Sequence, residues 1–205
     1  MLEITMLQNS PLYLAIQAAR ICYLSENKSD EDNIRLLKHV ISKDHTSVLE
    51  HIVFTFHIRN ISRGCLHQLV RHRLASYSVQ STRYTLKKIL KQDNLNKLII
   101  KTGDKLIDAN SLEALRNIKK VLENNDSKAN DLLKYNIPES LAIELMWTIN
   151  ARSIRNFFRL RTSKTAHWEI RNLALTILKL LYDSGYEVLF EDIIKQNKIP
   201  IDTLS

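Results

Sequence analysis

The sequence predicts an α+β protein, in which a modest, mainly antiparallel sheet packs with several helices, one of them long and in the C-terminal half. The sheet is indicated by residues 51–61, where Phe54, Phe56 and Ile58 alternate with Thr55 and His57 as in a half-buried strand. The long helix is indicated by 165–182, whose broad apolar arc is typical of a central or interface helix. Strand and helix signals therefore both occur in one chain.

Before this strand, two segments predict helices. Ser10 and Pro11 are expected to open a helix that runs to about Cys22, with the serine as cap and the proline at the first position. Residues 30–42 carry apolar side chains at helical spacing. The N-terminal part of the chain is therefore expected to be helical.

After the strand, Ser62 is a suitable N-cap for a short helix over residues 61–70. Residues 74–84 have no helical period and many polar side chains, which favours a loop. Residues 81–86 are expected to form a second strand that pairs with the first.

The second half contains two predicted helices before residue 150. Residues 110–123 begin with Asn110 and Glu113 in the arrangement of a capping box. Residues 138–148 are expected to form another helix.

Composition narrows the kinds of ligand and of binding site that the chain could have. The chain of 205 residues has 30 Lys and Arg against 22 Asp and Glu, a net charge of +8, which favours anionic partners. Many of these cations are scattered lysines in residues 86–134, where a solvated surface is the simpler interpretation. There are only three glycines, so the glycine-rich loops that usually hold phosphates are excluded. A phosphorylated ligand would have to be bound by Arg, Lys and hydroxyl groups.

Several site classes are not expected. No apolar run approaches the ~20 residues that span a bilayer, and the N-terminus lacks the features of a secretory signal. Cys22 and Cys65 form no CxxC pair, so a reducing, cytoplasmic location is expected. The spacing of His45, His51 and His57 matches no zinc motif, and no metal site is predicted.

The densest cluster of anion-binding side chains is Arg71-His72-Arg73, followed after seven residues by Ser81 and then by Arg83. One interpretation is an ordinary helix end, where cations complement the negative terminus. The alternative is a grip on two anions, because adjacent helical residues point about 100° apart.

A second cluster follows Asn150. Ser153 is expected to cap a helix that ends at Leu160, with Arg155 facing solvent and Arg161 at the end. Three polar side chains then share one helical face: Arg152, Asn156 and Arg159. Two explanations fit this shared face equally well. One is an anion site, and the other is an amphipathic helix whose arginine stems lie over apolar surface.

Together these residues resemble the flavin-dependent thymidylate synthase family, whose signature is Arg-His-Arg, seven residues, then Ser. The resemblance extends to HTSVLEHIVFTFHI before the signature and NARSIRNFFRLRTSKTAHWEI after it. It implies a single catalytic domain over residues 1–205, with a helical, less familiar segment at about 86–134.

The resemblance implies an enzyme that makes dTMP from dUMP in de novo nucleotide biosynthesis. The carbon would come from methylenetetrahydrofolate and the reducing equivalents from NADPH through bound FAD. Family members are homotetramers with active sites shared between subunits, so a homotetramer is expected, with no nucleic-acid polymer and no membrane as partner. The family uses no enzyme cysteine as nucleophile.

Residue roles are implied by the same resemblance. Arg161 would be catalytic, stabilising the N3-deprotonated uracil. The cofactor would contact Ser47, Arg71, His72, Arg73, Asn150, Arg152 and Asn156, with His45 near the flavin and folate. The nucleotide would contact Gln68, Arg71, Gln80, Ser81, Thr82, Arg83, Lys134 and Arg161.

The chain departs from the family pattern at two positions. Val79 stands where many members have Glu, and Lys134 stands where a nucleotide-binding Arg is common. Lysine keeps the charge but replaces a bidentate contact with a point contact.

Two other functions remain open from the sequence. A nucleic-acid-binding module would explain the positive charge and the aromatic residues beside arginines. A different flavin or nucleotide enzyme would use the same arginines for another reaction.

Overall fold

The computed structural model describes residues 1–26, 29–124 and 130–200. The chain divides into two compact units. The first comprises Met1–Glu3, Ile58–Val70 and Ser78–Leu145, and the second comprises Ile4–His57, Arg71–Tyr77 and Met146–Ser205.

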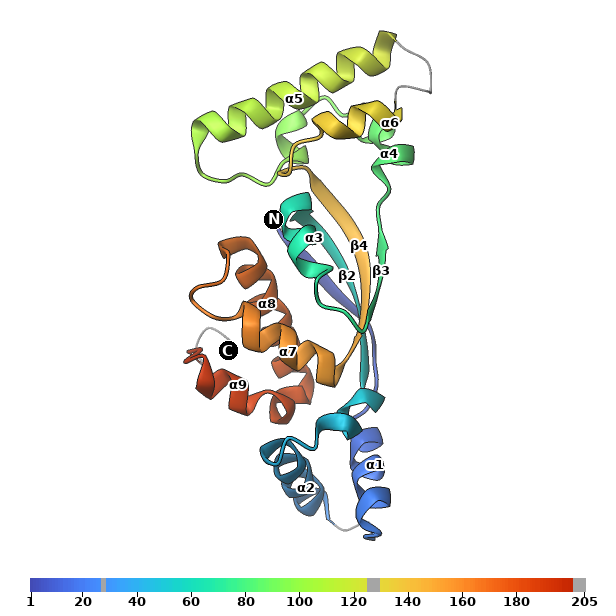
Figure 1. Cartoon of the computed structure of the whole chain (residues 1–205), viewed down its shortest axis with the longest axis vertical. Helices are drawn as coiled ribbons and strands as arrows, with labels where there is room; N and C mark the ends of the chain where they lie inside the picture. The colour runs from blue at the N-terminus through green and yellow to red at the C-terminus, as the bar shows by residue number, and fades with distance from the viewer. Residues whose placement is uncertain (27–28, 125–129, 201–205) are drawn as a thin grey trace. The chain divides into compact units, whose positions relative to one another are not determined.

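A four-stranded antiparallel sheet confirms the predicted α+β class (Figure 1). Its strands lie in the order β1-β2-β4-β3. Their bounds are β1 Glu3–Asn9, β2 Val53–Ser62, β3 Ala75–Val79 and β4 Ala142–Asn150. The two longest strands, β2 and β4, are therefore the central pair.

Strand β2 confirms the alternating pattern of residues 51–61. Phe54, Phe56 and Ile58 are fully buried. Thr55, on the other face, is also buried, and its hydroxyl lies 3.0 Å from that of Thr148 on β4. Because β2 lies between β1 and β4, the side chains of Gln8 and Thr148 on these neighbours flank Thr55 and help to bury it.

The helix predicted over residues 138–148 is wrong, because this segment enters β4. The side chains of Ile143, Leu145, Trp147 and Ile149 are buried in alternation. The short apolar run fits both the helical and the strand period. It forms a strand because it pairs with neighbouring strands of the sheet.

The strand predicted over residues 81–86 is also wrong. The strand that pairs is β3, and its neighbour is β4 instead of β2. Residues 82–89 form helix α4 (Thr82–Ile89), with Ser81 at the N-cap. The main-chain N–H of Gln80 still donates to the carbonyl of Glu144 at 2.9 Å, so strand-like pairing ends one residue before the N-cap of the helix.

The first unit holds a helical layer with its own core (Figure 1). Its helices are α3 Arg63–Leu69, α4 Thr82–Ile89, η2 Leu95–Leu98, α5 Lys105–Asn124, α6 Asn130–Leu133 and η4 Lys134–Asn136. Ser62 caps α3 as predicted, accepting from the N–H of Cys65. Helix α5 begins before the predicted Asn110, because Asp104 accepts from the N–H groups of Leu106 and Ile107.

The second unit contains most of the aromatic core. Its helices are α1 Tyr13–Tyr23, α2 Asp30–Ser42, η1 Thr46–His51, α7 Ala151–Arg161, α8 Trp168–Leu181, η5 Tyr182–Tyr186, η6 Glu187–Leu189 and α9 Glu191–Gln196. Ser10 does not cap α1 as predicted; its hydroxyl accepts from the N–H of Val53 at 3.1 Å. The long helix is confirmed, although α8 begins at Trp168 and not at residue 165.

Phe157 and Phe158 anchor α7 in this core, where Phe157 meets Trp147 edge-on at 5.1 Å between ring centroids. The face of α7 that remains outside the core is strongly basic. In the described ranges no helix is both long and apolar enough to cross a membrane.

Candidate functional site

Helix α7 starts one turn earlier than predicted. Its N-cap is Asn150, whose side-chain oxygen accepts from the N–H of Ser153 at 2.8 Å. Ser153 is therefore the third residue of the helix and not its cap. Asparagine is among the strongest N-caps. Asn150 therefore sets where α7 begins, and with it the positions of the arginines along the helix.

The polar face of α7 borders a cavity of about 440 Å³, here called the cationic cavity. The cavity lies within the second unit, and its wall carries four arginines against two carboxylates. Its lining residues are Asp44, Thr46, Glu50, His72, Arg73, Leu74, Arg152, Ser153, Arg155, Asn156 and Arg159. The predicted helical face of Arg152, Asn156 and Arg159 is thus confirmed as one side of a cavity.

Two of the four arginines are held by carboxylates. Arg152 donates to Glu50 at 2.6 Å, and both side chains are about half exposed. Arg155 donates to both oxygens of Asp192, at 2.8 and 2.6 Å, and also to the carbonyl of Leu189. The prediction that Arg155 faces solvent is wrong, because this ion pair draws it into the interior, where it is 3% exposed.

The contact with Arg155 affects the pKa of the Asp192 carboxyl. Burial alone would raise its pKa, but hydrogen bonding and charge attraction from Arg155 dominate, so the pKa lies below its ordinary value. Asp192 is therefore ionised at neutral pH. The pair fixes α9 against α7.

The other two arginines have no such partner. Within residues 1–26, 29–124 and 130–200, no side-chain hydrogen bond or ion pair is formed by the guanidinium of Arg73 or of Arg159. Both line the same cavity. Guanidinium groups bind phosphate oxygens in a bidentate manner, so the cationic cavity is suited to a phosphorylated ligand.

His72 connects the signature segment to the end of α7. Its ring is 6% exposed and lines the cationic cavity, and its Nε2 accepts a hydrogen bond from Nε of Arg161 at 3.0 Å. Burial and, secondarily, the charge of Arg161 lower the pKa of His72 from 6.5 to about 4. The middle residue of Arg-His-Arg is therefore a neutral, buried side chain and not a surface cation.

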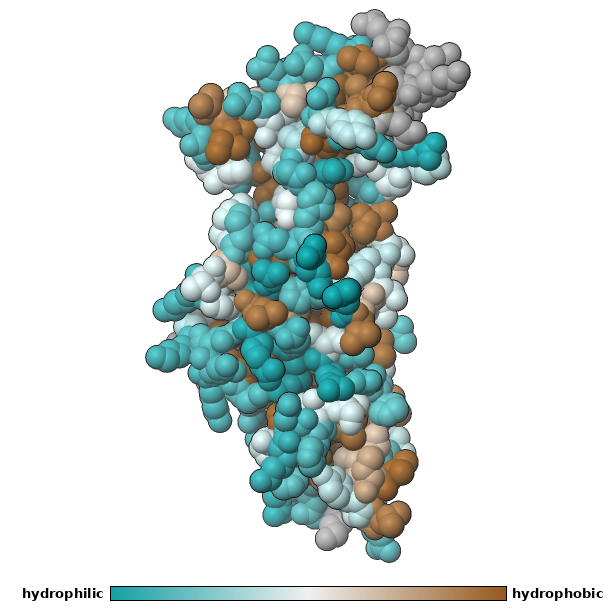
Figure 2. All heavy atoms as spheres, viewed as in Figure 1, coloured by the Kyte–Doolittle hydropathy of each residue, from teal (hydrophilic) through white to brown (hydrophobic). Residues whose placement is uncertain are grey.

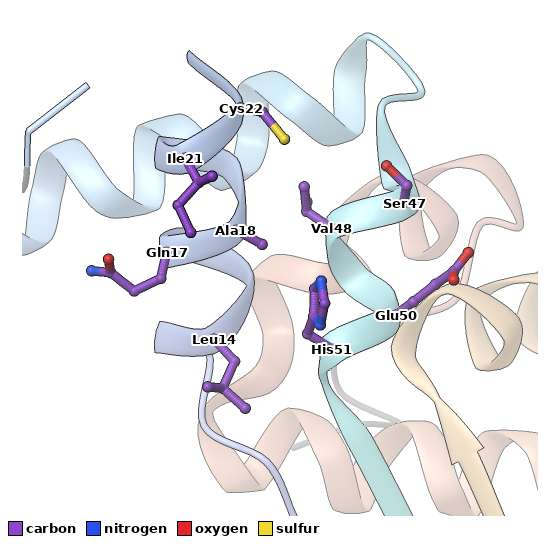
Figure 3. A pocket seen from close by; sticks show the side chains of 9 residues that line it. All are labelled: Leu14, Gln17, Ala18, Ile21, Cys22, Ser47, Val48, Glu50 and His51. Carbon is purple, nitrogen blue, oxygen red and sulfur yellow. The ribbon is translucent and has the colours of Figure 1, made fainter. Parts of the chain in front are cut away.

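A second cavity, of about 600 Å³, lies between α1 and η1 and is here called the apolar cavity (Figure 3). Leu14, Ala18 and Val48 line it, together with Gln17, Ile21, Cys22, Ser47, Glu50 and His51. Glu50 lines both cavities, so they adjoin within the second unit. Figure 2 shows hydrophobic surface over α1, where Ile21 is 73% exposed.

The structure places the predicted cofactor residues together in the second unit. His72, Arg73, Arg152 and Asn156 line the cationic cavity, and Ser47 lines the apolar one. Arg71 is exposed and lines neither. His45 precedes η1 and contacts the hydroxyl of Tyr23 through Nδ1 at 3.0 Å.

The predicted nucleotide residues divide between the units. Arg71 and Arg161 belong to the second unit. The first unit holds Gln68, Gln80, Ser81, Thr82, Arg83 and Lys134. Of these, Ser81 and Thr82 begin α4.

Sequence reasoning missed two carboxylates that shape the site. Glu50 could have been found, because it stands in the HTSVLEH block beside predicted residues. Asp192 carried no signal, since it follows Arg155 by 37 residues in a segment without a motif. Among the described residues no group of three or more His, Cys, Asp and Glu side chains could hold a metal ion.

Comparisons with known proteins agree on one family. The family profile described as "Thymidylate synthase complementing protein" matches residues 4–184. Flavin-dependent thymidylate synthase from Wolinella succinogenes is 42% identical over 192 residues, covering 88% of this chain and 93% of the relative. The enzyme of the same name from Campylobacter jejuni is 41% identical, covering 88% of this chain and 92% of the relative.

Solved structures agree as well. The crystal structure of thymidylate synthase X (ThyX) from Helicobacter pylori with FAD and dUMP superposes with a TM-score of 0.86. The identity is 34%, and the match covers 95% of this chain and all of that one. With His72 and Arg73 of its Arg-His-Arg signature lining the cationic cavity, this chain belongs to the flavin-dependent thymidylate synthase family and is an enzyme.

Proposed function

We propose that the protein converts dUMP to dTMP with FAD as cofactor, methylenetetrahydrofolate as carbon donor and NADPH as reductant. The observation that carries the proposal is the cationic cavity, which brings Arg73 of the Arg-His-Arg segment together with Arg159 of α7. Neither guanidinium has an ion-pair partner among the described residues. The related structure from Helicobacter pylori is one with FAD and dUMP.

The donor set fits a flavin dinucleotide. Arg73 and Arg159 offer guanidinium groups to a diphosphate without first breaking an ion pair among the described residues. The adjoining apolar cavity offers Leu14, Ala18 and Val48 to an aromatic ring. When bound, the flavin supplies hydride chemistry, and the protein supplies binding and electrostatics.

Most of the residues proposed to bind the cofactor line the two cavities. Arg152 and Asn156 project from one face of α7 into the cationic cavity, while Ser47 lines the apolar one. Asn150 contributes its side-chain nitrogen, because its oxygen is engaged in capping α7. Arg71 would contact both ligands, and His45 would lie near the flavin and folate.

Arg161 is the proposed catalytic residue. Carbon C5 of uracil becomes nucleophilic when the ring is deprotonated at N3, and a cation against the ring stabilises that form. A guanidinium suits this role because it stays protonated at every relevant pH and is planar like the pyrimidine. Substrate binding is assigned to Gln68, Arg71, Gln80, Ser81, Thr82, Arg83, Lys134 and Arg161.

The homotetramer with shared active sites and the cytoplasmic location belong to the same proposal. The exposed apolar surface of α1, with Ile21 and Tyr23, supports an association surface. Light scattering should give four times the chain mass. An inactive Arg161→Ala protein mixed with an inactive variant at Gln68 should recover activity if each site uses two subunits; no recovery would argue against sharing.

An absorption spectrum is the simplest test of the cofactor. Purified protein, after reconstitution with FAD, should be yellow. Its reduced flavin should be reoxidised faster in the presence of dUMP and methylenetetrahydrofolate than with either alone. A protein that stays colourless after reconstitution would contradict the proposal, and polymer binding with a steep salt dependence would favour a nucleic-acid module instead.

A further inference from the structure

The contact between Arg161 and His72 fixes the protonation state of the histidine. A guanidinium nitrogen is only a donor, so Nε2 of His72 must present a lone pair where Nε of Arg161 approaches at 3.0 Å. The single ring hydrogen of the neutral imidazole is then on Nδ1. One tautomer is therefore selected by geometry alone.

The ring of His72 is held from several sides. Its edge meets the ring of Phe157 at 90°, with 4.9 Å between centroids. The hydroxyl of Tyr77 donates to the main-chain carbonyl of His72 at 2.6 Å. A buried ring with these contacts has little freedom to turn, so its lone pair keeps one direction.

His72 contacts both the cationic cavity and Arg161. The imidazole lines that cavity, whereas Arg161, the last residue of α7, is not among its lining side chains. The other charged groups around the cavity are Asp44, Glu50, Arg73, Arg152, Arg155 and Arg159. The imidazole is thus shared between the cavity and the guanidinium.

We propose that His72 is a positioning residue for Arg161: its neutral Nε2 accepts the Nε hydrogen and fixes the plane of the guanidinium against the pyrimidine. This inference rests on the proposed function, because it assumes that Arg161 acts on uracil. His72 would then have two roles: it contacts the cofactor, and it orients Arg161.

The choice of histidine has a chemical reason. A carboxylate at this position would orient Arg161 but would also cancel the positive charge that the deprotonated pyrimidine requires, as Asp192 does for Arg155. A neutral imidazole orients the guanidinium without placing a negative charge beside it. Arg155 and Arg161 of α7 thus have acceptors suited to different tasks.

The tautomer can be measured without cofactor or turnover. Nitrogen-15 spectra of the histidine side chains at pH 7 should show His72 with an unprotonated Nε2 and a protonated Nδ1. The resonance is assigned by its loss in His72→Gln. In Arg161→Ala the pKa of His72 should rise toward its ordinary value. An Nε2–H tautomer or an imidazolium at pH 7 in the wild-type protein would overturn the inference.

Kinetics separate positioning from mere structure. Glutamine can place an acceptor oxygen near Nε2, and leucine cannot. At equal FAD occupancy, His72→Leu should lower kcat for dTMP formation by about 100-fold, the typical effect of a misplaced group. His72→Gln should recover at least about tenfold of this loss. His67→Leu, at an exposed histidine outside the site, is the matched control and should keep wild-type kcat.

The double variant His72→Leu/Arg161→Ala should be no slower than Arg161→Ala alone, because residues that act as one unit are not additive. Losses that multiply, or equal kcat for the leucine and glutamine variants, would overturn the positioning role. If the wild-type protein forms no dTMP, the proposed function fails, while the nitrogen-15 result still decides whether His72 holds Arg161.

Discussion

The arginines of α7 and the lysines of α4 and α5 carry the same charge but are held differently. Arg155 is buried against Asp192, and Arg161 donates to a buried imidazole. Lys87 and Lys91, in contrast, line a groove of about 310 Å³ in the first unit and form no ion pair with any described residue. Charge alone therefore does not identify a site.

The largest difference is expected for Arg161. Replacement by alanine should leave FAD bound and lower dTMP formation by about 100-fold to 1,000-fold, because one preorganised charge at a reacting centre is worth ~2.7–4 kcal/mol. Steady-state product analysis and the flavin absorbance measure the two effects. Wild-type turnover in Arg161→Ala would show that the end of α7 is no different from the lysine surface.

His72 makes the stability of the site depend on pH. Its pKa falls from 6.5 in the unfolded chain to about 4 in the folded protein, so the unfolded chain binds more protons between these values. Stability should be constant above about pH 6.5 and fall by roughly 2–3 kcal/mol as the pH drops to about 4. Urea unfolding across this range measures it, and His72→Gln should flatten that part of the profile. An unchanged slope in the variant would assign the loss to other groups.

The Arg155–Asp192 pair should contribute mainly to folding. Asp192→Ala leaves a buried guanidinium without its carboxylate, and unfolding should become easier by roughly 2 kcal/mol, less than for a fully buried pair because Asp192 is half exposed. Glu191→Ala, which removes an exposed partner of Lys38, should change stability by about 1 kcal/mol or less. Equal effects of the two changes would contradict the burial argument.

The smallest effect is expected for the lysines of the first unit. Alanine at Lys87, Lys91 or Lys119 should change the free energy of unfolding by about 0.5 kcal/mol or less, as is usual for surface positions. Enzyme activity should also stay near that of the wild type. A large loss of dTMP formation would place this groove in the functional site and remove the contrast with α7.

Some local features could be predicted from the sequence, whereas the pairing of distant segments could not. The cap at Ser62 and helix 30–42 depend on neighbouring residues and are confirmed. The strand Ala142–Asn150 was taken for a helix, because a short apolar run fits both periods and only its partners in the sheet decide. The strand predicted over residues 81–86 shows the same limit, because only the pairing in the sheet reveals that the strand is Ala75–Val79.

The site shows the same limit. The family motifs brought His72, Arg73, Arg152 and Asn156 into one set, and they do line one cavity. The contact between His72 and Arg161 joins residues 89 positions apart, and no local spacing could predict it. The burial of Arg155 also depends on a distant residue, Asp192, so local spacing alone could not predict it.

The most direct test is the transfer of the labelled carbon. Reconstituted protein with FAD, NADPH, dUMP and methylenetetrahydrofolate carrying carbon-13 in its methylene group should form dTMP labelled in the methyl group. Arg161→Ala, with its flavin bound, should form almost none. Unlabelled product, or no dTMP from a wild-type protein that binds both FAD and dUMP, would contradict the proposed function.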